Sequence, residues 1–296
     1  MKTFLLTTAA FGMLALPAMA ADVAPVYNAP IPVPAYTPIL VPVCIWCGFY
    51  LGLNAGGTWS DNDSVAVNSV LTQDFPPGPA SYGAASAAGA AGSVPVGAPV
   101  GIIGGGQIGY NWQVSSAWLV GLETDISYIT GVSGLGSGTL TNSVPFAFFG
   151  APEVVTTSIA STSKLDYLGT VRGRLGYLTP TFLLYGTGGL AYGGVKASTA
   201  ITQSSTGFLQ SSTSAAGAFS QMRAGWTLGA GLEWMFVQNW SAKVEYLHYD
   251  LGSVTFSNGV LRTSGAAVGI GLAVVGSTSS ATFSGDIVRA GVNYHW

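Results

Sequence analysis

The chain ends in Asp286-Ile-Val-Arg-Ala-Gly-Val-Asn-Tyr-His-Trp296, and the side chains of this stretch alternate in character. From Val288 onward every second residue is apolar or aromatic, whereas Arg289, Asn293 and His295 lie between them. Because successive side chains of a β-strand point to opposite faces, one face suits lipid and the other suits a polar interior. This is the pattern of a transmembrane strand, and it predicts a β-barrel in a bacterial outer membrane.

The first twenty residues agree with that location. Lys2 precedes an apolar run from Phe4 to Leu16, which is followed by Ala18-Met-Ala20. A positive residue, a short apolar run and small residues in this order are typical of a secretory signal peptide, so we expect residues 1–20 to be removed. No later stretch reaches the roughly 18 uncharged apolar residues that a membrane-spanning helix needs.

The remainder of the chain divides into two parts. Residues 21–45 carry prolines at 25, 30, 32, 34, 38 and 42, so we expect an extended, Pro-rich periplasmic segment there. Residues 46–296 are predicted to form a single outer-membrane β-barrel domain.

Composition supports a membrane barrel. Charged residues make up 7% of the chain, against about 25% in typical soluble domains, so a solvated charged surface is missing. The 42 glycines and the 11% of aromatic residues suit closely packed barrel walls with aromatic girdles. The net charge of −3 gives no reason to expect nucleic acid as a partner.

Eight alternating segments can be counted after the Pro-rich segment: 48–60, 102–114, 118–129, 164–178, 182–196, 221–237, 240–251 and 286–296. The second, fourth and sixth connections are very short, whereas the other four run for about 24 to 41 residues. Short periplasmic turns and long external loops produce that difference. The expected fold is all-β: a closed, eight-stranded, antiparallel up-and-down transmembrane barrel.

The same alternation assigns ten charged side chains to the interior: Glu123, Asp125, Asp166, Glu233, Glu245, Arg172, Arg174, Arg223, Lys243 and Arg289. Eight of them lie three to seven residues from the periplasmic end of their strands, or roughly 8–18 Å at about 3.3 Å per residue and a tilt near 40°. These eight exclude Asp166 and Arg223. They are predicted to form one neutral charged layer.

An eight-stranded barrel is only wide enough for its own side chains to fill, whereas porins with aqueous channels use about 16–18 strands. We therefore expect the charged layer to plug the lumen. Removing one partner of a buried ion pair typically costs about 3–5 kcal/mol, so Arg172→Ala should destabilise the barrel. A narrow porin or ion channel is the alternative, because sequence does not give the clearance between the side chains.

Six stretches carry a resemblance that covers nearly all of 46–296: Trp46-Cys-Gly-Phe-Tyr-Leu-Gly-Leu-Asn54, Gly121-Leu-Glu-Thr-Asp-Ile-Ser127, Gly169-Thr-Val-Arg-Gly-Arg-Leu-Gly-Tyr177, Leu184-Tyr-Gly-Thr-Gly-Gly-Leu-Ala-Tyr192, Asn239-Trp-Ser-Ala-Lys-Val-Glu-Tyr246 and Ile287-Val-Arg-Ala-Gly-Val-Asn-Tyr294. In them the chain resembles the alphaproteobacterial OmpA-like outer-membrane β-barrel surface proteins. The resemblance implies an eight-stranded barrel and a structural role in the envelope and at the cell surface. It implies no catalytic residues, metal or cofactor.

The resemblance also implies partners. Trp296 would be the terminal aromatic residue that the barrel-assembly machinery reads during biogenesis. The barrel would contact outer-membrane lipid and lipopolysaccharide, and contacts with peptidoglycan or host surfaces stay open.

Cys44-Ile-Trp-Cys47 departs from similar proteins, which usually carry a small polar residue at the second cysteine. The C-x-x-C spacing suits redox chemistry or half of a zinc site. There is no second cysteine pair for zinc and no βαβ context for a thioredoxin-like site. We therefore expect a local disulfide between Cys44 and Cys47.

Two strings imitate enzyme motifs. Residues 104–109 satisfy G-x-G-x-x-G, but they lie inside an alternating strand and not between a strand and a helix. Residues 161–164 satisfy S-x-x-K, but the companion S-D-N and K-T-G elements are missing. Both are interpreted as chance matches.

His248 supplies a more serious enzyme alternative, because some barrels deacylate lipid A at the external rim. A hydrolytic site needs a serine within hydrogen-bond reach of the histidine and a carboxylate that orients it. Asp250 is the candidate carboxylate, and Ser253 and Ser257 are candidate nucleophiles in a loop that strand geometry does not place. The simpler interpretation makes His248 an interfacial girdle residue.

The long loops suggest adhesion as a third class of function. Residues 80–106 are rich in Ala and Gly, and residues 265–276 are almost wholly apolar. Such loops can be contact surfaces, or they can pack over the barrel mouth. Within the last loop, Val254–Arg262 predicts a hairpin centred on Asn258-Gly259, which would extend the barrel or raise the strand count to ten.

Overall fold

Alternating apolar and polar residues form β-strands along most of the barrel. The computed structural model of the chain describes residues 45–74, 81–97, 99–144, 152–207, 210–264 and 271–296. The expected signal peptide, and the Pro-rich segment apart from Ile45, lie outside the described residues. No helix in these ranges is long and apolar enough to cross a membrane.

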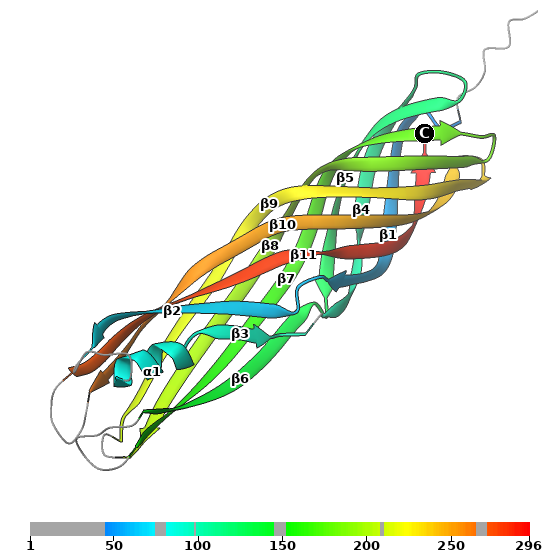
Figure 1. Cartoon of the computed structure of the whole chain (residues 1–296). Helices are drawn as coiled ribbons and strands as arrows, with labels where there is room; N and C mark the ends of the chain where they lie inside the picture. The colour runs from blue at the N-terminus through cyan, green and yellow to red at the C-terminus, as the bar shows by residue number, and fades with distance from the viewer. Residues whose placement is uncertain (1–44, 75–80, 98, 145–151, 208–209, 265–270) are drawn as a thin grey trace, which may run out of the picture. The chain divides into compact units, whose positions relative to one another are not determined.

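The described residues form eleven strands and one helix (Figure 1). Their bounds are β1 (Gly48–Ser60), β2 (Ser64–Asp74), α1 (Tyr82–Gly89), β3 (Gly92–Pro95), β4 (Val100–Gln113), β5 (Trp118–Thr130), β6 (Ser133–Val144), β7 (Glu153–Leu178), β8 (Phe182–Thr206), β9 (Ser212–Val237), β10 (Trp240–Ser264) and β11 (Gly271–His295).

The strands pair in an antiparallel, up-and-down order. The path runs β1-β4-β5-β7-β8-β9-β10-β11, and β11 pairs again with β1 from Tyr50↔His295 to Ser60↔Gly285. Each strand on the path therefore has a neighbour on both sides. The three remaining strands join at one end: β6 pairs with β7, β2 with β11, and β3 with β2. All eight segments that alternation predicts lie in the strands of the path, apart from the end residues Val114 and Trp296.

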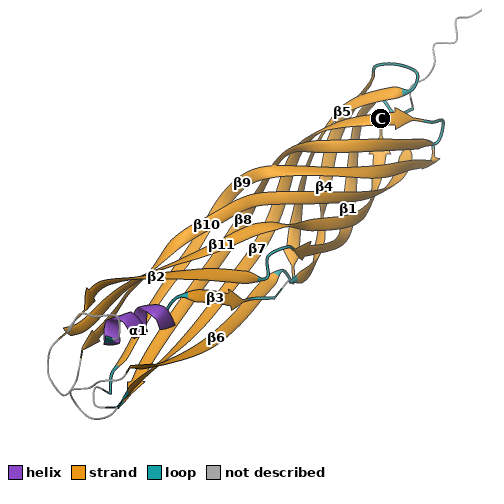
Figure 2. Cartoon of the chain, in the orientation of Figure 1, coloured by secondary structure: helices purple, strands orange, loops and turns teal. Residues whose placement is uncertain are grey.

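The prediction of long external loops is wrong for much of the chain. Strands β7 to β11 each run for 25 or 26 residues and continue far past their predicted ends. Strands β8 and β9, for example, stay paired as far as Ser204↔Ser212. The reason is that Ser, Thr, Ala and Val continue the alternation beyond the apolar band, where small polar residues replace the lipid-facing ones. Figure 2 shows these strands prolonging the barrel past β1, β4 and β5.

The first predicted loop folds onto this extension. It contains β2, α1 and β3, and the third predicted loop supplies β6. The Ser81 side chain caps α1 by accepting a hydrogen bond from the Ala84 N–H at 3.0 Å. Tyr82, Ser86 and Ala90 are fully buried against the extended strands. Of the two interpretations of the Ala- and Gly-rich stretch, packing over the barrel is thus the one that the described part of the stretch adopts.

The predicted hairpin at Asn258-Gly259 is wrong. Both residues lie inside β10, and the pairing with β11 shifts register between Ser257 and Gly259. Gly259 has a φ of +84°, which a glycine adopts without strain. The Asn-Gly signal therefore marks a β-bulge and not a turn.

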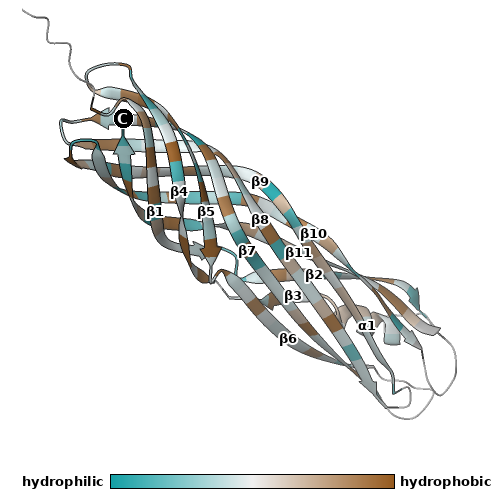
Figure 3. Ribbon diagram, turned by 180° about the vertical axis from the view of Figure 1, so that it is seen from behind, coloured by the Kyte–Doolittle hydropathy of each residue, from teal (hydrophilic) through white to brown (hydrophobic). Residues whose placement is uncertain are grey.

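Apolar and polar side chains share the interior of the extended barrel. A cluster of buried apolar residues comes from six strands of the path and from β2, and Leu168, Leu247 and Ile287 are among its members. Polar residues such as Thr157 and Gln203 are buried as well. A second cluster lies farther out, beside α1. Figure 3, coloured by hydropathy, shows brown and teal positions following one another along β1, β4 and β5.

Candidate functional site

The outer face of the short-turn end carries a belt of aromatic side chains. Trp118 lies against Tyr177 with ring centroids 5.7 Å apart, and Trp240 lies against Tyr294 at 5.2 Å. Trp118, Tyr177 and Trp240 are exposed and Tyr294 is half-buried, and aliphatic residues above them such as Leu53 are also exposed. An apolar wall with an aromatic girdle is the surface that a transmembrane barrel presents to lipid.

Charged side chains occupy the inside of the same part of the barrel, and Arg172 of β7 lies at their centre. Its guanidinium is fully buried and contacts three carboxylates. It contacts Glu123, and it lies 3.0 Å from an oxygen of Asp125 and 3.0 Å from an oxygen of Glu245. The Thr170 hydroxyl, which donates to Asp125, also accepts a hydrogen bond from Arg172 Nε at 2.9 Å.

Two further cations join the same carboxylates. Arg289 of β11 lies 3.0 Å from Asp125 and 2.7 Å from Glu245. Lys243 Nζ lies 3.2 Å from Glu123 and 3.7 Å from Glu245. Each carboxylate in this group therefore faces at least two cations, which offsets the cost of removing it from water.

The fourth cation, Arg174, faces the periplasmic end. It lies 2.8 Å from Glu233 and 3.8 Å from Glu123, so it joins the two halves of the network. Glu233 also accepts hydrogen bonds from Asn293 at 2.6 Å and from Ser241. His295 completes this half, with Nε2 at 3.2 Å from Glu233.

The structure thus brings together all eight residues of the predicted layer: Glu123, Asp125, Glu233, Glu245, Arg172, Arg174, Lys243 and Arg289. Four carboxylates meet four cations, and no member is more than 4% exposed. Strand register explains the proximity. Glu123 stands opposite Arg172, Lys243 opposite Glu233, and Glu245 opposite Arg289.

Asp166 and Arg223 lie apart from this network. The pairing of β7 with β8 shifts register between Leu165 and Leu168, and Asp166 sits at that irregularity. It pairs with two exposed lysines, Lys196 at 2.6 Å and Lys164 at 2.9 Å. Arg223, which stands opposite Gly193 of β8, donates to the Ser253 carbonyl at 3.2 Å.

Two tyrosines belong to the network although charge counting does not find them. Tyr50 donates to Glu123 at 2.6 Å, and Tyr185 donates to Glu245 at 3.0 Å. The Arg174 guanidinium lies over both rings, 5.4 Å and 4.0 Å from their centroids. The ring of Tyr185 covers Gly231, where a Cβ would meet the phenol. The parity of the strands could have identified both tyrosines as inward-facing.

Buried apolar side chains lie on both sides of the charged layer. Toward the external end lie Ile103, Ile129 and the rest of the buried apolar cluster of the extension. Toward the periplasmic end, Trp46 is 3% exposed and packs with Leu119 and Leu183. Asn111 anchors this segment by donating to the Trp46 carbonyl at 3.0 Å.

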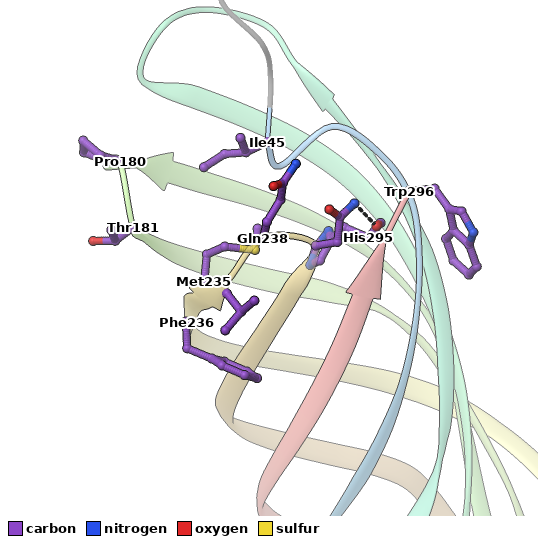
Figure 4. Close-up of a pocket in the computed structure, with 10 residues that line it drawn as sticks. Ile45, Pro180, Thr181, Met235, Phe236, Gln238, His295 and Trp296 are labelled. Carbon is purple, nitrogen blue, oxygen red and sulfur yellow. Dashed lines mark hydrogen bonds between the residues drawn. The ribbon is translucent and has the colours of Figure 1, made fainter.

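A pocket of about 460 Å³ lies at the periplasmic end, between the turns and the end of β11 (Figure 4). Ile45, Gln238 and His295 line it, and the Asn239 side chain donates to the His295 carbonyl at 2.7 Å. Trp296 turns away from the lumen in Figure 4 and is 65% exposed. Its role as an assembly signal stays a prediction.

The cysteine pair is partly described. Cys47, just before β1, is not a free thiol. Cys44 lies outside the described residues, so its pairing with Cys47 stays a prediction.

The residues that were predicted as a possible hydrolytic site around His248 do not lie together in the structure. His248 Nδ1 lies 3.1 Å from Asp286, and not against the expected Asp250, whose carboxylate accepts a hydrogen bond from the Gly252 N–H. The hydroxyl of Ser253 contacts Thr282 at 2.9 Å. Within the described ranges no serine hydroxyl hydrogen-bonds to the His248 ring.

Comparison with known proteins places the chain. The outer membrane protein beta-barrel domain matches residues 6–295. The 31 kDa outer-membrane immunogenic protein of Brucella melitensis is 36% identical over 255 residues, covering 85% of this chain and 88% of that protein. The 22 kDa outer membrane protein of Rhizobium leguminosarum bv. viciae is 34% identical over 180 residues, covering 57% of this chain and 65% of that protein.

Among solved structures, OprG from Pseudomonas aeruginosa aligns over 84% of this chain and 97% of its own, with 11% identity and a TM-score of 0.34. The family match and the Brucella relative confirm both the predicted resemblance and the predicted location. The chain belongs to the outer membrane protein beta-barrel domain family, and its place is the bacterial cell outer membrane.

Proposed function

We propose that the protein is a structural barrel of the outer membrane, closed by eight strands and filled by its own side chains, which contributes to envelope integrity and to the cell surface. In this proposal permeation through the lumen is limited or absent. The observation that carries it is the contact of Arg172 with Glu245 across the interior.

The contacts of the charged layer run between strands on opposite sides of the path. Arg172 lies in β7 and Glu245 in β10, and β8 and β9 separate these strands. Arg289 in β11 likewise contacts Asp125 in β5, although β1 and β4 lie between. Side chains that meet across the whole width leave little room for water, as expected for eight strands.

The order of the layers supports the same conclusion. Ions would have to pass the apolar cluster around Leu168 and Leu247 before they reached the charged layer, and Trp46 beyond it. Burying an ion without a partner in such surroundings costs several kcal/mol even after relaxation. A filled interior of this kind favours rigidity and not transport.

We also propose that the protein has no enzymatic activity. Among the residues that the structure describes, no serine hydroxyl hydrogen-bonds to His248 as hydrolysis would require, and the charged layer is buried. Both observations favour a structural role over the lipid A-modifying alternative.

The test is single-channel conductance in a planar bilayer. The refolded protein is compared with Arg172→Ala, and with Asp166→Asn as a matched variant that lies outside the layer. We expect no conductance steps from wild type or from Asp166→Asn, after circular dichroism and gel mobility have shown that they are folded. Regular steps from folded wild-type protein would reject the proposal in favour of a narrow porin.

A second assay extends the test to uncharged solutes. Liposomes that contain the barrel are placed in isotonic solutions of sugars of increasing size, and swelling is followed by light scattering. Swelling no faster than that of empty liposomes is expected. Faster swelling in the smallest sugars would contradict a filled lumen even if no ion current were seen.

A further inference from the structure

A second cluster of functional groups lies on the outer wall, at the level where β1 ends. It consists of Asp61, His248 and Asp286, whose possible ligand atoms all lie within 4.8 Å of one another. His248 Nδ1 is 3.1 Å from an oxygen of Asp286 and 3.9 Å from an oxygen of Asp61. His248 shares its face of β10 with the exposed Val244 and not with the buried Leu247, so the cluster points away from the lumen.

Three segments distant in sequence supply these residues. In the sheet, Asp286 of β11 stands opposite both Trp59 of β1 and His248 of β10. Asp61 follows β1 directly, and its N–H donates to the Ser284 carbonyl at 3.1 Å. The cluster therefore spans the seam at which the first and last strands of the barrel meet.

Neighbouring groups hold the ligand atoms in place. Tyr246, two residues before His248 on the same face, donates a short hydrogen bond to Asp286. The Asn62 side chain donates to the Ser284 hydroxyl at 3.1 Å, which fixes the turn that carries Asp61. Hydrogen bonds to ligating carboxylates are a regular feature of protein metal sites.

The cluster carries excess negative charge. The carboxylates of Asp61 and Asp286 lie close together, and His248 is the basic side chain beside them. Throughout the described part of the chain, neither carboxylate has a lysine or arginine as a salt-bridge partner. Two carboxylates held together without a permanent cation form a site that a divalent ion would neutralise.

We propose that Asp61, His248 and Asp286 bind a divalent transition-metal ion of the zinc class. Zinc takes imidazole nitrogen and carboxylate oxygen in four-coordinate sites, whereas calcium prefers six to eight oxygen ligands. Three protein ligands leave one position for water. The bound ion joins the end of β1 to β10 and β11, so it fastens the seam of the barrel.

Binding at the seam has a measurable consequence. An ion that binds the folded barrel and not the unfolded chain stabilises the barrel by mass action. Zinc should therefore raise the unfolding temperature, and a chelator should reverse the effect. A cluster that was only a solvated polar rim would show neither response.

The experiment uses the protein without an affinity tag, refolded in detergent and freed of metal with a chelator. Zinc is titrated by calorimetry, and cobalt is added in parallel because its absorption spectrum reports coordination geometry. Calcium serves as the comparison ion. We expect one zinc per chain, a four-coordinate cobalt spectrum and no calcium binding at the same concentrations.

His248→Gln should weaken zinc binding at least tenfold, since even residues that only orient metal ligands typically contribute tenfold to hundredfold. Asp61→Asn, in the turn and outside any strand, provides a second variant that does not disturb a strand. Asp63→Asn is the matched control, two residues away and outside the cluster. The proposal would be overturned if wild type did not bind zinc stoichiometrically, or if His248→Gln and Asp61→Asn bound zinc as tightly as wild type. Calcium binding as tight as zinc binding would also overturn it.

Discussion

Arg289 and Asp125 lie 164 residues apart in the chain, and their side chains meet inside the barrel with Nη2 3.0 Å from Oδ2. One residue comes from the last strand and the other from the third strand of the path. Neither is more than 4% exposed. Charged residues from distant parts of the chain therefore form one continuous network only when the barrel closes. This dependence links the network to the stability of the barrel.

Replacing Arg172 by alanine should lower the free energy of unfolding by about 3–5 kcal/mol, because it leaves Glu123, Asp125 and Glu245 with fewer counterions in a buried site. Equilibrium unfolding in urea, with the barrel in lipid vesicles, measures the loss. Asp166→Asn removes a charge of the outer, exposed ion pairs, so it should change the midpoint little. An Arg172→Ala protein with the midpoint and slope of wild type would contradict a structural role for the layer.

Arg174 and Glu233 should be coupled in a double-mutant cycle. Arg174→Met leaves Glu233 without its arginine, and Glu233→Gln leaves Arg174 with only the more distant Glu123. The double variant should be more stable than the sum of the single losses predicts, by about 0.5–3 kcal/mol, since contacting residues are not additive. Strictly additive losses would show that the two side chains stabilise the barrel independently.

The interior faces of the eight strands could be predicted from sequence because the period of two leaves no freedom once one residue of a strand is assigned. Glu123 and Asp125 face inward for the same reason that Leu122 faces lipid. Depth could be predicted for residues close to a short turn, since strand rise is nearly constant. The inward assignment of Asp166 failed, because the register shift between Leu165 and Leu168 interrupts the alternation there, and its side chain pairs with exposed lysines.

The extension could not be predicted in the same way. Beyond the apolar band both faces of a strand can be polar, so the contrast that reveals a membrane strand disappears. Thr199 and Ser205 are buried in β8, yet nothing in their local sequence separates them from loop residues. Thr199, for example, contacts the hydroxyl of Ser161 in β7 at 3.1 Å, a partner that is remote in sequence.

The cluster of Asp61, His248 and Asp286 could not be predicted from the sequence for a related reason. His248 was paired with Asp250 because both occur on one face of one strand. The structure gives it Asp286 instead, since the cross-strand neighbour lies closer than a residue two positions along the same strand. Register between β10 and β11, which sequence alone does not supply, decides the partner.

Trp46→Ala should destabilise the periplasmic end of the barrel. Trp46 is buried against Leu119 and Leu183, and its ring meets that of His295 edge-on with centroids 5.8 Å apart. Truncating a buried tryptophan to alanine typically costs about 3–5 kcal/mol. Urea unfolding measures the loss, and Ile45→Ala, at the exposed neighbouring residue, is the control. Equal effects of the two substitutions would mean that the burial of Trp46 does not stabilise the barrel.

The ion pairs of Asp166 give a pH dependence whose direction can be derived. The hydrogen bond from Lys196, followed by that from Lys164, lowers the pKa of Asp166 in the folded barrel. A carboxyl group with a lowered pKa contributes stability above its unfolded pKa and loses it as the pH falls through the folded value. Wild type should therefore be slightly more stable than Asp166→Asn near neutral pH, and the difference should disappear in acid.

The same difference should shrink in high salt, because both lysines are about half exposed and surface ion pairs are readily screened. Thermal unfolding of both proteins across a pH series, at low and high ionic strength, measures it. Comparing the two proteins at each pH cancels whatever the common carboxylates of the interior contribute, so the remaining difference belongs to Asp166. A difference that grew as the pH fell would mean that Asp166 is stabilised in its neutral form, which its two lysine partners do not allow.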